Sequence, residues 1–101
     1  MTITLRRTAE FDRWLTSLSD DRALARIQTR LFRLTQGNPG DVEPVGNGLS
    51  ELRINYGPGY RVYFGKRGTT LIVLLAGGDK RTQSRDIRHA KALWDIWQQE
   101  N

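Results

Sequence analysis

The sequence predicts one α+β domain over residues 1–101, in which a small antiparallel sheet carries two N-terminal helices on one face and a C-terminal helix. Three observations lead to this prediction. Helical periodicity marks the start and the end of the chain, whereas short strand-like runs lie between them. A Gly-Pro-Gly turn joins two of those runs into a hairpin. The chain length suits a single domain with one core.

The N-terminal part predicts a short strand and then a helix. Residues 2–6 alternate polar and apolar side chains with the period of two that is typical of a strand. A helix is expected to begin near Thr8. Its apolar stripe, at intervals of three and four residues, is Phe11, Trp14, Leu15 and Leu18.

A second helix is expected between a Ser19-Asp20-Asp21 N-cap and Gly37, which ends it. Its buried stripe is Leu24, Ile27, Leu31 and Leu34. Beside this stripe runs a basic one, formed by Arg22, Arg26, Arg30 and Arg33. The basic stripe is either a solvated helix face, an extension of an RNA-binding surface, or a dock for an acidic partner segment.

The middle of the chain predicts a loop and then a hairpin. Residues 37–48 are rich in Gly and Pro and are expected to form the loop. Leu49–Tyr56 and Tyr60–Gly65 read as two strands joined by a turn centred on Pro58. The expected pairs on the apolar face are Leu52 with Phe64, Ile54 with Val62, and Tyr56 with Tyr60. On the other face, Arg53 is expected to meet Tyr63 and Asn55 to meet Arg61.

The C-terminal part predicts a third strand of this block and a long helix. Thr69–Ala76 has an apolar centre, as expected of a central strand. Gly77–Arg81 is expected to leave the strand end, and a helix to run from Thr82 or Gln83 to Gln99. Its packing stripe is Ile87, Ala90, Leu93, Trp94 and Trp97. The predicted order is therefore β-α-α-β-β-β-α.

Composition narrows the classes of function. The formal net charge is +5 and the isoelectric point is near 10.2. Residues 51–101 hold nine Lys or Arg against five Asp or Glu, so the surplus lies where a phosphate backbone would be attracted. The absence of cysteine excludes disulfides and thiolate chemistry and suits a reducing cytoplasm. No apolar run has the length of a signal peptide or a membrane span, so we expect a soluble, cytoplasmic protein without membrane contact.

Two clusters are candidates for binding phosphate. Arg53 and Arg61 share a predicted sheet face with Asn55 and Tyr63. Arginine forks bind phosphate oxygens bidentately, and tyrosine supplies a donor and a stacking surface. An exposed sheet face can also carry charge for purely structural reasons.

The second cluster is Gly77-Gly78-Asp79-Lys80-Arg81. The glycines would let the backbone pass close to a ligand while Lys80 and Arg81 project toward the hairpin. The alternative is an ordinary connection in which Asp79 or Thr82 caps the helix. The glycine pair matches no dinucleotide or P-loop pattern, so no nucleotide cofactor is expected.

The other titratable groups are weaker candidates for a catalytic or metal-binding role. His89 is expected to be exposed and incidental, and one histidine without cysteine does not make a zinc site. We expect no metal and no cofactor. Glu51 shares the parity of Arg53, so it is either a charge partner or a general base.

Several segments together carry a family resemblance: Phe11–Leu15 with the basic second helix, Gly48–Ile54, Tyr56–Phe64, Gly77–Gln83 and Asp86-Ile87. In these segments the chain resembles the RelE/ParE superfamily of bacterial toxin–antitoxin systems, and within it the HigB-like addiction-module killer branch. The resemblance implies a toxin that causes growth arrest as a ribosome-dependent endoribonuclease, inhibiting translation by cutting messenger RNA. In RelE-like toxins the substrate's own 2′-hydroxyl attacks, leaving a cyclic phosphate and a free 5′-hydroxyl.

The resemblance also assigns roles. Arg61 matches the family arginine that holds the scissile phosphate. Lys80 and Arg81 match the basic residue that stabilises charge or protonates the leaving oxygen, and Arg53 stands near basic strand positions. The earlier-strand lysines and the C-terminal tyrosine of RelE are absent, which leaves the general base unassigned. Gln83 and Tyr63 are the candidates for a further contribution.

The partners implied are the ribosome, messenger RNA and a cognate antitoxin with a helix-turn-helix domain and an acidic or amphipathic segment. The main alternative is a ParE-like inhibitor of DNA gyrase, a binding toxin without nuclease chemistry, because one fold can host both functions. A further alternative is an inactive or merely RNA-binding relative.

Overall fold

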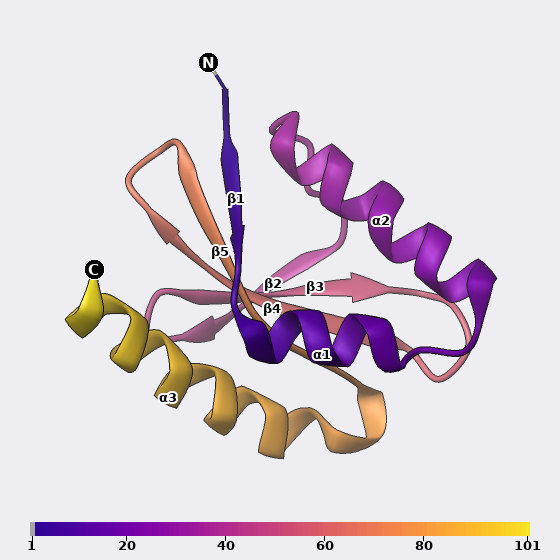
Figure 1. Cartoon of the computed structure of the whole chain (residues 1–101). Helices are drawn as coiled ribbons and strands as arrows, with labels where there is room; N and C mark the ends of the chain where they lie inside the picture. The colour runs from indigo at the N-terminus through magenta and orange to yellow at the C-terminus, as the bar shows by residue number, and fades with distance from the viewer. Residues whose placement is uncertain (1) are drawn as a thin grey trace.

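The computed structural model describes residues 2–101 and confirms the α+β class (Figure 1). The elements are β1 (Thr4–Arg7), α1 (Ala9–Ser17), α2 (Asp21–Thr35), β2 (Val42–Gly46), β3 (Leu49–Ile54), β4 (Tyr60–Arg67), β5 (Leu71–Asp79) and α3 (Gln83–Glu100). A single 3₁₀ turn, Lys80–Thr82, connects β5 to α3. No helix within residues 2–101 is long and apolar enough to cross a membrane.

Over residues 2–101 the sheet has five strands, in the order β1-β5-β4-β3-β2. β1 pairs with β5 in parallel, whereas the other pairs are antiparallel. β2 lies in the segment that the sequence predicts as a loop, so that prediction is wrong over Val42–Gly46. The Gly and Pro content of this segment is typical of a loop, so the sequence pattern does not reveal the strand. Pro44 is tolerated because β2 is an edge strand, where a missing N–H leaves no ladder bond unmade.

The β3–β4 hairpin keeps the predicted faces but not the predicted register. Leu52 pairs with Val62 and Arg53 with Arg61, a shift of two residues from the expected pairing. The shift arises because the connection is longer than Gly57-Pro58-Gly59: the Tyr56 N–H donates to the Ile54 carbonyl, which closes the ladder before Asn55 can join it. Since side chains alternate with a period of two, a two-residue shift leaves each on its predicted face.

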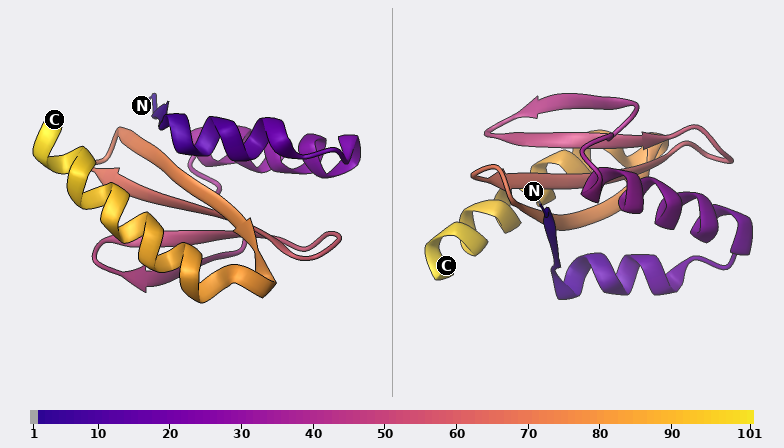
Figure 2. Two further views of the ribbon diagram at one scale, coloured as in Figure 1. Left: turned by 60° about the horizontal axis from the view of Figure 1, so that its bottom comes forward. Right: turned by 90° about the horizontal axis from the view of Figure 1, so that it is seen from above.

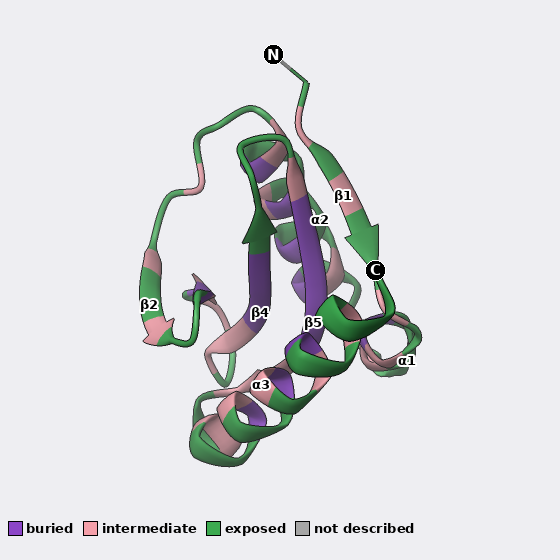
Figure 3. Ribbon diagram, turned by 90° about the vertical axis from the view of Figure 1, so that its left-hand side faces the viewer, coloured by how far each residue is buried: buried purple, intermediate pink, exposed green. Residues whose placement is uncertain are grey.

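Helices cover both faces of the sheet, and two cores result (Figure 2). The core on the side of α1 and α2 is built from Phe11, Leu15, Ile27, Leu31, Leu34, Leu52, Ile54, Val62, Phe64, Ile72 and Leu74. The core under α3 is built from Leu49, Tyr63, Val73, Leu75, Ala76, Ala90 and Trp94. The central strands β4 and β5 are accordingly buried along much of their length, while β1 and β2 are more exposed (Figure 3).

The two N-terminal helices begin where the sequence predicts. Thr8 caps α1 by accepting a hydrogen bond from the Phe11 N–H, and Asp20 caps α2 by accepting from the Ala23 N–H. These caps satisfy amide donors that have no partner inside the helix. The Tyr56 hydroxyl donates to the same Asp20 carboxylate at 3.2 Å, so the hairpin loop is tied to the start of α2.

β5 continues through Gly77 and Gly78, so the prediction that these glycines leave the strand is wrong. They are needed because neighbouring elements approach the strand closely. A Cβ on Gly77 would overlap the Trp14 ring, and one on Gly78 would overlap the Asp86 carboxylate. The absence of side chains at Gly77 and Gly78 therefore makes room for side chains of α1 and α3 rather than for a ligand.

This close approach predicts the effect of Gly77→Ala. The added methyl must displace the Trp14 ring, so the free energy of unfolding should fall by about 1–3 kcal/mol. In a Trp14→Ala background the same change should cost less than half as much, because the ring is gone. Urea denaturation of the four proteins of this cycle measures both values. Equal costs in the two backgrounds would show that the ring is not what excludes the methyl.

Candidate nucleic-acid interface

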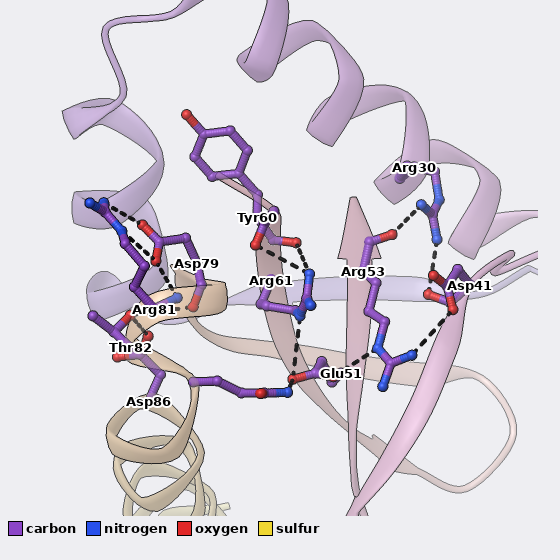
Figure 4. Close-up of polar contacts among 12 residues, drawn as sticks. Arg30, Asp41, Glu51, Arg53, Tyr60, Arg61, Asp79, Arg81, Thr82 and Asp86 are labelled. Atoms are coloured by element: carbon purple, nitrogen blue, oxygen red, sulfur yellow. Dashed lines mark hydrogen bonds and ion pairs between the residues drawn. The ribbon is translucent and has the colours of Figure 1, made fainter. Parts of the chain in front are cut away.

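The carboxylate of Glu51 on β3 is fully buried and lies between the side chains of three elements (Figure 4). Its Oε2 accepts a hydrogen bond from Arg53 Nε at 3.0 Å. Its Oε1 accepts one from the Gln83 amide on α3 at 2.6 Å and lies 3.7 Å from Arg61 Nε on β4. The structure therefore joins Glu51, Arg53, Arg61 and Gln83, and Glu51 acts as a charge partner.

Arg53 and Arg61 pair directly across β3 and β4, an arrangement that two like charges would oppose. Glu51 offsets this repulsion, and its hydrogen bond raises the pKa of Arg53. The Arg53 side chain remains 35% exposed and also lies 3.9 Å from Asp41. It can thus present its guanidinium to a ligand.

Arg61 is more recessed than the sequence predicts, since its side chain is only 12% exposed. One terminal nitrogen donates to the carbonyl oxygens of Gly59 and Tyr60, at 3.2 and 3.3 Å. Its Nε is buried without a hydrogen bond of ordinary geometry among residues 2–101. These contacts hold Arg61 in one orientation, in the recessed part of the cluster rather than at its exposed edge.

Lys80 lies next to Gly59 in the turn between β3 and β4. A Cβ built on Gly59 would lie 3.4 Å from the Lys80 Cβ and 3.5 Å from a terminal nitrogen of Arg61, so both flank this glycine. Lys80 is exposed. Gly59 itself has a φ of +83°, a conformation that favours glycine.

Arg81 differs from Lys80. Its guanidinium donates to Asp79 at 3.0 Å, and its side chain is 79% exposed. This hydrogen bond lowers the pKa of Asp79. Asp79 also accepts from the Arg81 backbone N–H and caps the 3₁₀ turn, which is the structural alternative for this segment. Thr82 precedes α3 without a side-chain cap.

A basic hollow of about 390 Å³ opens at the start of α3. It is lined by Lys80, Arg81, Thr82, Gln83, Ser84, Arg85 and Arg88. Sequence reasoning missed Arg85 and Arg88. The signal available was their spacing of three residues, which places them on one side of a helix next to Lys80 and Arg81. The positive surface thus extends along α3.

Tyr63 lies on the same sheet face as Arg53 and Arg61, as predicted, but the prediction that it is exposed there is wrong. The residue is fully buried in the core under α3, because this helix covers the sheet face on which Tyr63 lies. Burial, followed by the negative charges of Glu51 and Asp86, raises the pKa of its hydroxyl. Tyr63 therefore stays protonated and does not reach the surface.

Asn55 is also misplaced by the sequence prediction. It follows β3 as an exposed loop residue and does not pair with Arg61. It lines a cavity against α2 instead, together with Ala25, Arg26, Thr29, Arg30, Arg33 and Ile54. The structure thus separates Asn55 from the cluster around Glu51.

The basic stripe of α2 is partly structural. Arg30 donates to the backbone carbonyls of Arg53, Pro39 and Asp41, and its burial lowers its pKa. The Arg26 guanidinium lies 4.7 Å from the centre of the Tyr56 ring. These contacts fasten α2 to the chain on either side of β3.

His89 and Asp86 are titratable groups of α3 that lie outside the cluster around Glu51. His89 is exposed, as expected, and its Nε2 lies 3.4 Å from a Glu10 carboxylate oxygen. The buried Asp86 accepts a hydrogen bond from the Thr82 hydroxyl. Within residues 2–101, no three His, Asp or Glu side chains are grouped to hold a metal ion.

Comparison with known proteins finds similarity to a relative in sequence and to a solved structure in fold. The chain is 50% identical over 93 residues to an uncharacterized protein of Haemophilus influenzae, covering 92% of this chain and 94% of the relative. The two belong to one family. No family model matches the sequence.

The fold neighbour is a chain of the toxin–antitoxin complex RelBE2 from Mycobacterium tuberculosis. It superposes with a TM-score of 0.63 at 24% identity, covering 79% of this chain and 100% of the neighbour. The likeness establishes a RelE-like fold, in agreement with the expectation from the sequence motifs.

The burial of Tyr63 predicts the outcome of Tyr63→Phe. Removing a buried hydroxyl without a good hydrogen bond should leave the free energy of unfolding unchanged or raise it by up to about 1 kcal/mol. Guanidinium denaturation measures this change. A loss above about 1 kcal/mol would reveal a strong hydrogen bond to the hydroxyl.

Proposed function

We propose that this chain is the toxin of a type II toxin–antitoxin system, of the HigB-like branch, and that it cleaves messenger RNA on the ribosome in the cytoplasm. The observation that carries the proposal is the gathering of Arg53, Arg61 and Lys80 at one end of the sheet of a RelE-like fold. Such a cluster suits a phosphate group better than any apolar ligand. The basic hollow along α3 supports a longer polyanionic substrate.

The proposed reaction needs no external nucleophile. The ribose 2′-hydroxyl attacks the adjacent phosphorus, the bond from phosphorus to the 5′-oxygen breaks, and a 2′,3′-cyclic phosphate and a 5′-hydroxyl result. Arg53 and Arg61 would hold and neutralise the phosphate, while Lys80 would stabilise or protonate the leaving oxygen. Arg81 would contribute to the surrounding field. Positioning and charge stabilisation then supply most of the acceleration.

The proposal assigns no general base. Gln83 is engaged as a donor to Glu51 and would act by holding the cluster. The proton of the 2′-hydroxyl would therefore pass to solvent water as the 2′-oxygen bonds to phosphorus.

A second candidate is a ParE-like inhibitor of DNA gyrase. The recessed position of Arg61 and the burial of Tyr63 favour it, because a binding toxin needs neither an accessible catalytic arginine nor a surface tyrosine. The same basic surface would then serve only for docking.

Translation in vitro with 5′-end mapping of the message separates these functions. We expect cleavage at defined codon positions that depends on ribosomes and leaves free messenger RNA intact. An intact message together with gyrase-dependent DNA breakage would instead establish the gyrase inhibitor.

Lys80→Ala tests the site itself. Lys80 is exposed, so its loss should leave the melting temperature unchanged while cleavage falls by about 100-fold or more. The matched control is Lys66→Ala, another exposed lysine, at the opposite end of β4 beside Ile72. Growth arrest on induction should be lost with Lys80→Ala and kept with Lys66→Ala. Full toxicity of Lys80→Ala would remove this residue from the site.

We also propose a cognate antitoxin with a helix-turn-helix domain and an acidic segment that covers the basic surface. Electrostatic attraction of this kind weakens with salt. Co-expression with the product of a neighbouring small reading frame should restore growth, and the purified pair should elute as one complex. Absence of binding between the two purified proteins at low salt would contradict the pairing.

A further inference from the structure

The buried carboxylate of Glu51 is the part of the cluster that the proposed chemistry does not use. Within residues 2–101, Glu51 and Asp86 are the buried charged residues. Burying a carboxylate is costly unless charged and hydrogen-bonding partners surround it. A buried carboxylate at the centre of the basic surface therefore requires an explanation.

Both oxygens of Glu51 are already engaged. Oε2 accepts from Arg53 Nε at 3.0 Å, and Oε1 accepts from Gln83 at 2.6 Å while facing Arg61 Nε at 3.7 Å. The side chain is 1% exposed. A substrate hydroxyl has no path to either oxygen, so Glu51 does not serve as a proton acceptor.

We propose that Glu51 is a positioning residue that orients Arg53 and Arg61 toward one phosphate group of the substrate. The identity of that substrate as RNA rests on the proposed function. Glu51 connects β3, β4 and α3 through its three partners, and it screens two guanidinium groups that pair directly across the strands. Without the carboxylate, those groups repel each other and no longer share a fixed direction.

The same carboxylate weakens the attraction for polyanions. Its negative charge lies beneath the arginines and reduces the positive potential that a phosphate backbone meets. Removing the negative charge should therefore disturb the orientation of the arginines and, at the same time, raise the affinity for polyanions. A residue that only supported the fold would lower both together.

Glu51→Gln, which keeps the size of the side chain, tests this inference, with Glu100→Gln at the exposed end of α3 as the matched control. A short unstructured single-stranded RNA should bind to Glu51→Gln roughly two- to tenfold more tightly. Ribosome-dependent cleavage should fall about 10- to 100-fold in turnover rather than in apparent affinity. The control should match the wild type in both. Unchanged or weaker binding by a folded Glu51→Gln protein would overturn the inference.

A second measurement does not depend on nuclease activity. In the ¹⁵N-labelled full chain, the Nε–H signals of Arg53 and Arg61, assigned through Arg53→Lys and Arg61→Lys, should exchange with water more slowly than those of surface arginines. Glu51→Gln should reduce this protection at Arg53, whose Nε–H donates to Glu51, and Glu100→Gln should keep it. Exchange in the wild type at the rate of exposed arginines would refute the positioning role, even if Glu51→Gln failed to fold.

The two measurements separate failure of the inference from failure of the proposed function. A wild-type protein that cleaves no message but protects both Nε–H groups would refute the nuclease and retain the positioning role. A protein that cleaves the message without protecting those groups would do the reverse.

Discussion

One buried carboxylate organises the polar end of this molecule. Glu51 engages Arg53 on its own strand, Arg61 on the neighbouring strand and Gln83 at the first turn of α3. Removing a single partner from such a buried cluster leaves charge uncompensated in a medium of low dielectric constant. The register of β3 and β4, the docking of α3 and the direction of the arginines are therefore mutually dependent.

The layering of the fold determines where a ligand can approach. Helices cover both sheet faces, so neither is open along its whole length. Tyr63 is buried under α3, whereas Arg53, on the same face but farther along the sheet, is partly exposed. The candidate interface is thus confined to one end of the sheet, where the hairpin and the start of α3 meet.

The sequence predicted most of this architecture because hydrophobic periodicity and capping are local signals. The errors arise from tertiary contacts. Tyr56 lies outside the hairpin ladder, where it contacts Asp20 and Arg26, and the register differs by two residues from the expected one. The parity of Arg53 and Arg61 was nevertheless predictable, because it depends only on strand alternation.

The residues around Glu51 likewise fall into those that local sequence signals predict and those that tertiary contacts place. Lys80 was predictable from its place after β5, but the recession of Arg61 was not, because it depends on the carbonyls of Gly59 and Tyr60. The roles of Gly77 and Gly78 depend on Trp14 and Asp86, which are remote in sequence. A strand pattern alone cannot show which side chain will fill the space over a glycine.

The parallel pairing of β1 with β5 has a consequence for the order of assembly. Thr8, which directly follows β1, donates its hydroxyl to the carbonyl of Leu75, and these residues lie 67 positions apart. Contacts of such long range form late, because the intervening chain must be available first. Gln83, which donates to Glu51, lies still later in the chain. During synthesis from the N-terminus, the arginine cluster therefore cannot close until α3 begins to emerge, and an unfinished chain carries no organised anion-binding surface.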